Sequence, residues 1–220
     1  MRRVPEPELM LDRVQAQAYA DADFSEPHSR FVELIHDRLG AQVERGHALD
    51  LGCGPADVTI RFARRFSHVR VHGIDASEAM LQLGRQAIAS AGLSERVELF
   101  GGRLPEALLP RETYDGIFSN SLLHHVVHPS VLWDVVHRAA TPGAWVFVMD
   151  LMRPTDQAEA RRFVELYAAA EPEVLRRDFY RSLRAAYRPD EVREQLRSAD
   201  LDSLEIEVVS DRHLIVWGRV

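Results

Sequence analysis

The sequence contains no lysine, so all 27 of its basic residues are arginine. This absence excludes a phosphate-binding loop that depends on lysine, a Schiff-base lysine and a lysine acting as a general base. Cys53 is the only cysteine, so neither an intrachain disulfide nor a cysteine-based zinc site can form. Such cysteine usage is typical of a protein in a reducing cytoplasm, which is the expected location.

Long apolar runs and basic runs are also missing. No segment approaches the roughly 20 uninterrupted apolar residues of a membrane span, and Pro5 and Glu6 stand where a signal peptide would be apolar. The 34 acidic residues exceed the 27 basic ones, which gives a formal charge of −7. Because binding along a phosphate backbone needs clustered positive contacts, neither nucleic acid nor a membrane is an expected partner.

Short apolar runs alternate with stretches of helical character through the middle of the chain. This alternation predicts βαβ units and a parallel sheet covered on both faces. Strands are expected at 46–51, 69–74, 96–100, 114–119, 143–149, 204–209 and 213–218. Helices are expected at 6–20, 27–40, 57–67, 77–91 and 129–140, and over 155–200 with breaks near Pro172 and Pro189.

The last two strands are separated by a short turn around 210–212, which favours an antiparallel hairpin. The sequence therefore predicts one α/β domain over 1–220, with a seven-stranded, mostly parallel, doubly wound sheet and an antiparallel edge strand. Residues 46–150 would form the core, and 201–220 would form the hairpin. The segments 1–45 and 151–200 would be helical lids over a pocket.

The most informative segment, 48–57, runs from an apolar strand through an acidic residue and a glycine-spaced turn into a helix. Gly52 and Gly54 allow a tight turn and a close approach by a ligand. A dinucleotide site would need a third small residue where Asp57 stands, and Asp50 adds a second negative charge that would repel a pyrophosphate. Asp75 ends the next strand, where a carboxylate can accept hydrogen bonds from ribose hydroxyls. The combination indicates an adenosine ligand that carries a positive centre and no pyrophosphate.

On these residues the sequence resembles the class I S-adenosylmethionine (SAM)-dependent methyltransferases, particularly the small-molecule branch of the ubiquinone and menaquinone biosynthesis type. The resemblance covers about 44–152, including 114–125 as the family's fourth motif and 141–149 as its Pro-Gly turn and fifth strand. It implies that SAM is the cofactor and S-adenosylhomocysteine (SAH) the product. The implied cofactor-binding residues are Asp50, Gly52, Cys53, Gly54, Asp75, Ala76, Met80, Gly102, Arg103, Leu104, Ser119 and Asn120.

Two departures from the family pattern affect this assignment. The third motif commonly ends in Gly-Asp, whose acid accepts from the adenine amino group, but here it is Gly102-Arg103-Leu104. Because arginine cannot accept a hydrogen bond, the backbone near Leu104, a neighbour such as Glu106, or stacking must hold the adenine. The fourth motif is not Asn-Pro-Pro-Tyr either, which argues against N-methylation of a macromolecule.

The histidines at 124, 125 and 128 follow the fourth predicted strand. Adjacent histidines in an extended loop tend to diverge, so no metal site is expected there. One histidine could pack against the cofactor or cap the next helix. Alternatively, His124 or His125 could face the acceptor and remove its proton, and His125 is the preferred acceptor-side residue.

The predicted lids supply the remaining candidates. Tyr19 and Phe24 precede the first strand, and Tyr180 and Arg181 lie in the helical insertion where the family builds its acceptor pocket, so these four are candidate substrate contacts. The predicted function is methyl transfer from SAM to a small-molecule acceptor by direct displacement. The alternatives are a SAM-binding module without turnover and a nicotinamide-dependent oxidoreductase, which Asp57 disfavours. The oligomeric state and the acceptor atom are open.

Overall fold

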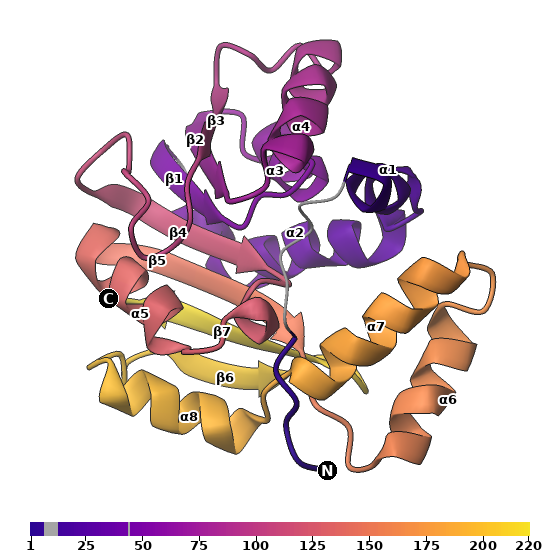
Figure 1. The fold of residues 1–220 in the computed structure, drawn as a ribbon. Coiled ribbons are helices and arrows are strands. Elements are labelled where there is room, and N and C mark those ends of the chain that lie inside the picture. The colour runs from indigo at the N-terminus through magenta and orange to yellow at the C-terminus, as the bar shows by residue number, and fades with distance from the viewer. Residues whose placement is uncertain (7–12, 44) are drawn as a thin grey trace.

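The computed structural model describes residues 1–6, 13–43 and 45–220, and within them seven strands form one sheet in the order β3-β2-β1-β4-β5-β7-β6 (Figure 1). The neighbouring strands from β3 to β5 pair in parallel, whereas β7 pairs antiparallel with both β5 and β6. The strands are β1 (Gly46–Leu51), β2 (Val69–Asp75), β3 (Val97–Gly101), β4 (Tyr114–Asn120), β5 (Ala140–Leu151), β6 (Glu205–Val208) and β7 (His213–Arg219). The predicted fold class is confirmed, and the β6–β7 hairpin forms the antiparallel edge.

The helices also follow the sequence prediction closely. They are α1 (Arg13–Asp21), α2 (Ser25–Leu39), α3 (Asp57–Arg65), α4 (Glu78–Ser90), α5 (Ser130–Ala139), α6 (Gln157–Tyr167), α7 (Glu173–Ala185) and α8 (Pro189–Ser198), with short 3₁₀ helices η1 (Gly40–Gln42) and η2 (Leu123–His125). The first predicted helix, at 6–20, falls partly outside the described residues, and α1 accounts for its second half. The breaks predicted near Pro172 and Pro189 separate α6, α7 and α8.

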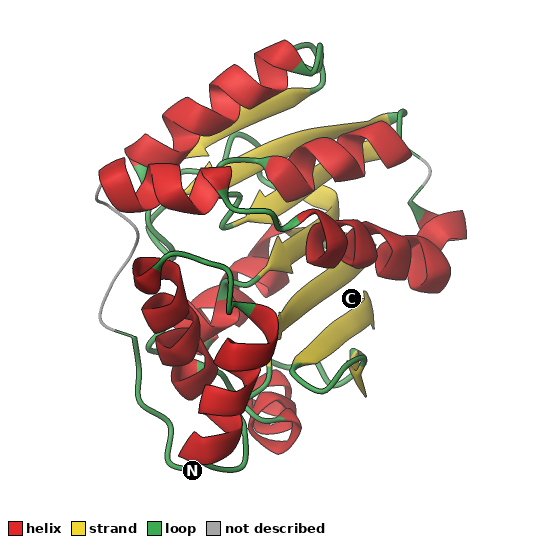
Figure 2. Cartoon of the chain, turned by 90° about the vertical axis from the view of Figure 1, so that its right-hand side faces the viewer, coloured by secondary structure: helices red, strands yellow, loops and turns green. Residues whose placement is uncertain are grey.

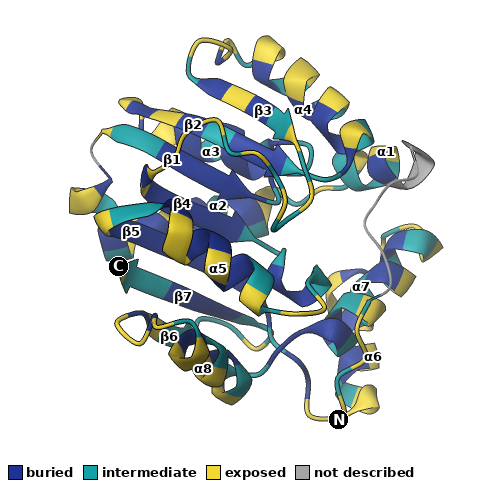
Figure 3. Cartoon of the chain, turned by 60° about the vertical axis from the view of Figure 1, so that its left-hand side comes forward, coloured by how far each residue is buried: buried dark blue, intermediate teal, exposed yellow. Residues whose placement is uncertain are grey.

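Both faces of the sheet are covered by helices (Figure 2). Side chains alternate between faces along a strand, so Phe147 and Met149 of β5 pack with α2 and α3, whereas Val146 and Val148 pack with α5 and α8. The central strands β1, β4, β5 and β7 are mostly buried, the edge strands β3 and β6 carry exposed residues, and many exposed residues lie on the outer faces of the helices (Figure 3). This arrangement leaves the carboxyl ends of the parallel strands as the edge at which a ligand can bind.

Helix α1 and the pair of helices α6 and α7 lie beyond that edge (Figure 1). Helix α1 contacts α4 and α7, and α6 and α7 pack against each other as a helical hairpin. The first residues of the chain run along α7, because Val4 N donates to Arg184 O at 3.0 Å and Arg3 Nε donates to Ala185 O at 2.6 Å. The Arg3 guanidinium also lies 3.9 Å from the ring centroid of Tyr187. The N-terminus is thereby held beside the ends of the strands.

Ser77 caps the helix that follows β2, as its sequence position predicts. Its hydroxyl oxygen accepts a hydrogen bond from Met80 N at 3.3 Å. Replacing Ser77 with alanine should lower the free energy of unfolding by about 1 kcal/mol, the usual cost of losing a serine N-cap. Urea denaturation would measure the loss, with Ser90→Ala at the exposed end of the same helix as the control. An equal loss in both variants would contradict the capping role.

Candidate active site

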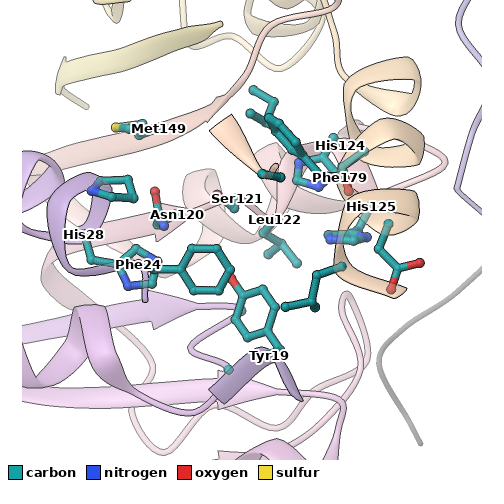
Figure 4. A pocket seen from close by; sticks show the side chains of 18 of the residues that line it. Tyr19, Phe24, His28, Asn120, Ser121, Leu122, His124, His125, Met149 and Phe179 are labelled. Atoms are coloured by element: carbon teal, nitrogen blue, oxygen red, sulfur yellow. The ribbon is translucent and has the colours of Figure 1, made fainter. Parts of the chain in front are cut away.

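A cavity of about 380 Å³ opens at the carboxyl ends of the parallel strands. The strand ends and the turns after them contribute Gly52, Gly54, Asp75, Asn120, Met149 and Leu151. The N-terminal helices cover one side with Tyr19, Phe24 and His28, and η2 and α7 bring His124, His125 and Phe179 to the other (Figure 4). The cavity therefore joins the turn that holds Gly52 and Gly54 (the glycine turn) to the loop that carries His124 and His125 (the histidine loop). The sequence singles out both regions.

The glycine turn is built on backbone conformations that favour glycine. Gly52 and Gly54 have φ values of +74° and +51°. The amides of Gly52 and Cys53 both donate to Ile74 O, at 2.8 and 3.1 Å, which ties the turn to β2. A Cβ on Gly52 would come within 2.9 Å of Leu122, whereas a Cβ on Gly54 would meet nothing. The open space at Gly54 lets a ligand approach the backbone closely.

Asp75 is oriented by the same turn. Its Oδ2 accepts from Gly54 N at 2.9 Å, and its Oδ1 accepts from Ser77 N at 2.8 Å. Burial raises the pKa of Asp75, against the effect of these backbone donors. A carboxylate oxygen has more than one acceptor site, so both oxygens can still accept hydrogen bonds from hydroxyl groups of a ligand in the cavity.

Asp50 lies behind the turn, beside a second cavity of about 40 Å³ that shares Gly52, Gly54 and Asn120 with the first. Asp50 is 2% exposed, and its Oδ2 accepts from the Thr59 hydroxyl at 2.6 Å. Burial raises the pKa of Asp50 to about 7, despite the Thr59 hydrogen bond, and the Asp75 carboxylate adds to the increase. A cationic ligand would favour the charged form of this group.

Asp57 is paired with two side chains of the protein. Its Oδ2 lies 2.7 Å from His28 Nδ1 and 2.8 Å from Arg61 Nε. Burial alone would raise the pKa of Asp57, but these partners hold it below its usual value. The charge of Asp57 is therefore paired within the protein, and its predicted repulsion of a pyrophosphate stays a prediction. No local pattern in the sequence indicates that His28 pairs with Asp57.

The predicted cofactor residues divide into those that border the two cavities and those that do not. Met80 and Asn120 line the larger cavity, and Cys53 borders the smaller one, packed under Gly73. Ser119 uses its hydroxyl inside the sheet, where it donates to Leu51 O at 2.7 Å. The residues that border neither cavity are Ala76, Gly102, Arg103, Leu104 and Ser119. Ser77, which sequence reasoning treats only as a helix cap, lines the larger cavity.

The third motif does not face the cavity. Gly102 N donates to Asp75 O at 2.9 Å, and the side chain of Arg103 is exposed to solvent. Arg103, predicted as a cofactor-binding position, therefore does not border the cavity, and its role in cofactor binding stays a prediction. Gly102 affects the cavity only indirectly, because its hydrogen bond fixes the backbone of Asp75.

The aromatic residues from the N-terminal helices lie near Asp75. The ring centroids of Tyr19 and Phe24 are 4.8 Å apart, and those of Phe24 and His28 are 5.4 Å apart. Burial raises the pKa of Tyr19 to about 12, and the carboxylates of Asp75 and Asp57 add to the increase. Tyr19 is therefore a neighbour of the predicted cofactor residues as well as part of the lid.

The histidine loop holds a buried ion pair. His124 Nδ1 lies 2.5 Å from Asp150 Oδ1, and the side chains are 3% and 2% exposed. His124 N also donates to Asp150 Oδ2 at 3.2 Å. Burial alone would lower the pKa of His124, but the Asp150 carboxylate outweighs it and raises the pKa. For His125, burial and the nearby His124 lower the pKa well below its ordinary value.

The two histidines do not diverge. Their ring centroids are 4.1 Å apart, because η2 turns the loop back on itself after Leu122. The prediction that adjacent histidines in this loop point apart is wrong, and with it the reason for expecting no metal site. His128 is exposed and lies outside the cavity lining.

Helix α7 presents a different face from the one predicted. Leu175, Asp178, Phe179 and Ser182 line the cavity. Arg181 is exposed and lies 3.8 Å from Asp178, and the Tyr180 ring packs under the Arg184 guanidinium, 5.6 Å from its centroid. Tyr180 and Arg181 are thus not on the lining of the cavity, and their substrate contacts stay a prediction. His213 also reaches the cavity, from β7.

Residues 48–143 match the methyltransferase domain family model, and the fold around them is the Rossmann-like fold seen in SAM-dependent methyltransferases of known structure. The demethylmenaquinone methyltransferase of Symbiobacterium thermophilum is 27% identical over 128 residues, which cover 58% of this chain and 49% of that protein. The chain spans about half the length of such curated relatives.

Solved structures resemble the chain over more of its length. A SAM-dependent methyltransferase from Aquifex aeolicus has a TM-score of 0.69 at 18% identity, covering 95% of this chain and 98% of that one. The plantazolicin methyltransferase BpumL, solved with SAH, has a TM-score of 0.65 at 14% identity and covers 94% of each chain. Across residues 1–6, 13–43 and 45–220, no helix has the length and apolar character that a membrane crossing requires.

Proposed function

We propose that this chain is a SAM-dependent methyltransferase that transfers a methyl group to a small-molecule acceptor and releases SAH. The observation that supports this function best is the continuity of the cavity. Its lining runs from Gly54 and Asp75, which suit an adenosine ligand, to His124 and His125 at the other end. A sulfonium methyl is already activated, so holding it in line with an acceptor in an enclosed cavity supplies much of the catalysis.

The cofactor roles follow from the polar groups in the cavity. Asp75 would accept from the ribose hydroxyls, and the backbone of Gly52 and Gly54 would lie against the methionine portion of SAM. Asp50, buried behind the turn, would favour the positive charge of that portion. Met80 would border the adenine, which leaves the backbone or stacking to replace the acid missing at Arg103.

The choice of a small acceptor is supported by charge and enclosure. The chain carries a formal charge of −7, which disfavours nucleic acid. The acceptor end of the cavity lies under α7 and the first residues of the chain, where apolar Leu175 and Phe179 meet the histidines. The single cysteine supports a reducing location such as the cytoplasm.

Calorimetric titration with SAM, SAH and NAD, after a check for co-purified cofactor, tests the cofactor assignment. Binding of SAM and SAH without NAD is the expected result. Tight NAD binding would favour an oxidoreductase, and failure to bind SAM or SAH would overturn the proposal. Methyl transfer to candidate acceptors then separates an enzyme from a binding module without turnover.

Replacing His125 with alanine should leave SAM affinity unchanged and lower turnover by about 10²-fold or more, the usual contribution of a positioned acid or base. The reason is that His125 lies beside His124 and Phe179, on the opposite side of the cavity from His28 (Figure 4). Titration with SAM and a methyl-transfer assay measure the two effects, with the exposed His128→Ala as the control. An equal loss of binding and turnover would instead place His125 among the cofactor contacts.

A further inference from the structure

Three potential metal ligands meet at the acceptor end of the cavity. Glu6, His124 and His125 each offer one ligand atom, and these atoms all lie within 4.8 Å of one another. His125 Nδ1 lies 3.3 Å from Glu6 Oε2. Two imidazoles and a carboxylate form a donor set that suits zinc and other divalent first-row transition ions.

Glu6 is held in this position by its own segment. Arg3 donates through Nη2 to His124 O at 3.3 Å and to Val126 O at 3.2 Å, so the first residues are fastened directly to the histidine loop. The Ser182 hydroxyl on α7 donates to Glu6 Oε2 at 3.1 Å. The Glu6 side chain is only 9% exposed, which means that the carboxylate is taken out of solvent to face the two histidines.

The Asp150–His124 pair has the geometry of an outer-shell support for a metal ligand. Protein histidines that bind a metal through one ring nitrogen almost always donate the other N–H to a carboxylate or carbonyl. His124 places Nδ1 2.5 Å from Asp150 Oδ1, and this contact leaves Nε2 as the nitrogen available to an ion. Asp150 also accepts from His124 N, which fixes the backbone of the same residue.

The imidazole of His125 supplies an independent indication of an ion-binding site. Its Nδ1 is buried and has no hydrogen-bond partner, although a carboxylate oxygen lies 3.3 Å away. A buried ring nitrogen without a partner is costly, and the relative orientation of this nitrogen and Glu6 is not that of a hydrogen bond. An ion placed between the two groups would satisfy both at once.

We propose that Glu6, His124 and His125 bind one divalent transition-metal ion of the zinc type, with Asp150 positioning His124. Three protein ligands leave a coordination position open, and the cavity lies beside it. Resting on the proposed methyltransferase function, the site would select an acceptor with an oxygen donor, such as a hydroxyl group, whose proton the ion would make more acidic. His125 would then support turnover as a ligand of the ion, in place of removing the proton itself. Among the residues that the structure describes, this is the one such group of ligands found.

Zinc binding by the full-length, tag-free protein tests the site without knowledge of the acceptor. Chelator-treated protein would be titrated with Zn²⁺ against a chromophoric competitor, and Co²⁺ absorption would report the nitrogen and oxygen ligand set. One ion per chain is expected. His125→Ala and Glu6→Gln should each weaken binding by at least about 100-fold, and Asp150→Asn by about 10- to 100-fold.

His128→Ala is the matched control, because it removes an exposed histidine three residues from His125 and should leave zinc affinity unchanged. The absence of stoichiometric binding, or binding that His125→Ala and Glu6→Gln leave intact, would overturn the proposal. Circular dichroism shows whether each variant is folded, and SAM titration of the same samples tests the methyltransferase function separately. Protein that binds SAM but not zinc would refute the metal site alone.

Discussion

Replacing Asp75 with alanine is expected to weaken SAM binding by about 1–3 kcal/mol, which corresponds to roughly a 5- to 150-fold loss of affinity. The carboxylate is the hydrogen-bond acceptor that faces the cavity at the end of β2. It also accepts from the amides of Gly54 and Ser77, so its loss loosens the turn that borders the ligand. Calorimetric titration with SAM measures the change.

Two further variants make the Asp75 result interpretable. Asp75→Asn keeps one acceptor oxygen and should lose less affinity than the alanine variant. Asp115→Ala is the matched control, because Asp115 also accepts from a backbone amide, that of His47, but at the amino ends of β1 and β4. Full SAM affinity in folded Asp75→Ala protein would show that the ribose site has been assigned to the wrong residue.

The positions of the strands along the chain and their mostly parallel pairing could be predicted because these signals are local. Each strand is a short apolar run bounded by turn residues, and the alternation with helices implies parallel pairing. Gly52, Gly54 and Asp75 could be predicted for the same reason, since their roles depend on the backbone within one βα unit. Their place at the cavity follows from parallel strands ending at one edge of the sheet.

Contacts between distant segments could not be predicted in the same way. Glu6 reaches His125 because Arg3 is hydrogen-bonded to η2 and to the end of α7. No local sequence pattern predicts these long-range hydrogen bonds. Asp150 did have a signal, because it lies near the end of β5 much as Asp75 ends β2. Its pairing with His124 nonetheless depends on how η2 turns.

The error on α7 has a simple geometric cause. Successive residues of a helix are rotated by about 100°, so neighbours in sequence face different surroundings. Residues 175, 178, 179 and 182 follow the i, i+3, i+4, i+7 spacing of one helical face, and that face borders the cavity. Tyr180 and Arg181 belong to other faces. The family resemblance indicated this helical segment, but only the packing of α7 against the rest of the fold selects the face that borders the cavity.

Replacing Asp50 with asparagine is expected to stabilise the protein relative to the wild type by about 3 kcal/mol more at pH 9 than at pH 5. Burial raises the pKa of Asp50 to about 7 in the folded state, from an ordinary value of 3.8. A group whose pKa is raised by folding contributes stability below its unfolded pKa, and this contribution is lost as the pH rises through the folded pKa. The cost of the buried charge is therefore complete well above pH 7, and asparagine removes it.

Urea denaturation at pH 5 and pH 9 measures this effect. The Asp50→Asn variant should gain stability relative to the wild type between these two values, and the exposed Asp115→Asn should not. Thr59→Val is a second comparison, because removing the hydroxyl that donates to Asp50 should raise the pKa of the carboxyl further. Equal pH dependence in the wild type and Asp50→Asn would contradict the buried-charge argument.

The same carboxyl should couple SAM binding to proton release. A positively charged ligand beside Asp50 favours the carboxylate, so SAM should bind with loss of a proton near neutral pH, and Asp50→Asn should abolish that loss. Calorimetry in buffers of different ionisation enthalpy measures the proton directly. Asp50→Asn would then be more stable at alkaline pH yet bind SAM more weakly, because the buried charge that destabilises the empty protein is the one that attracts the cofactor.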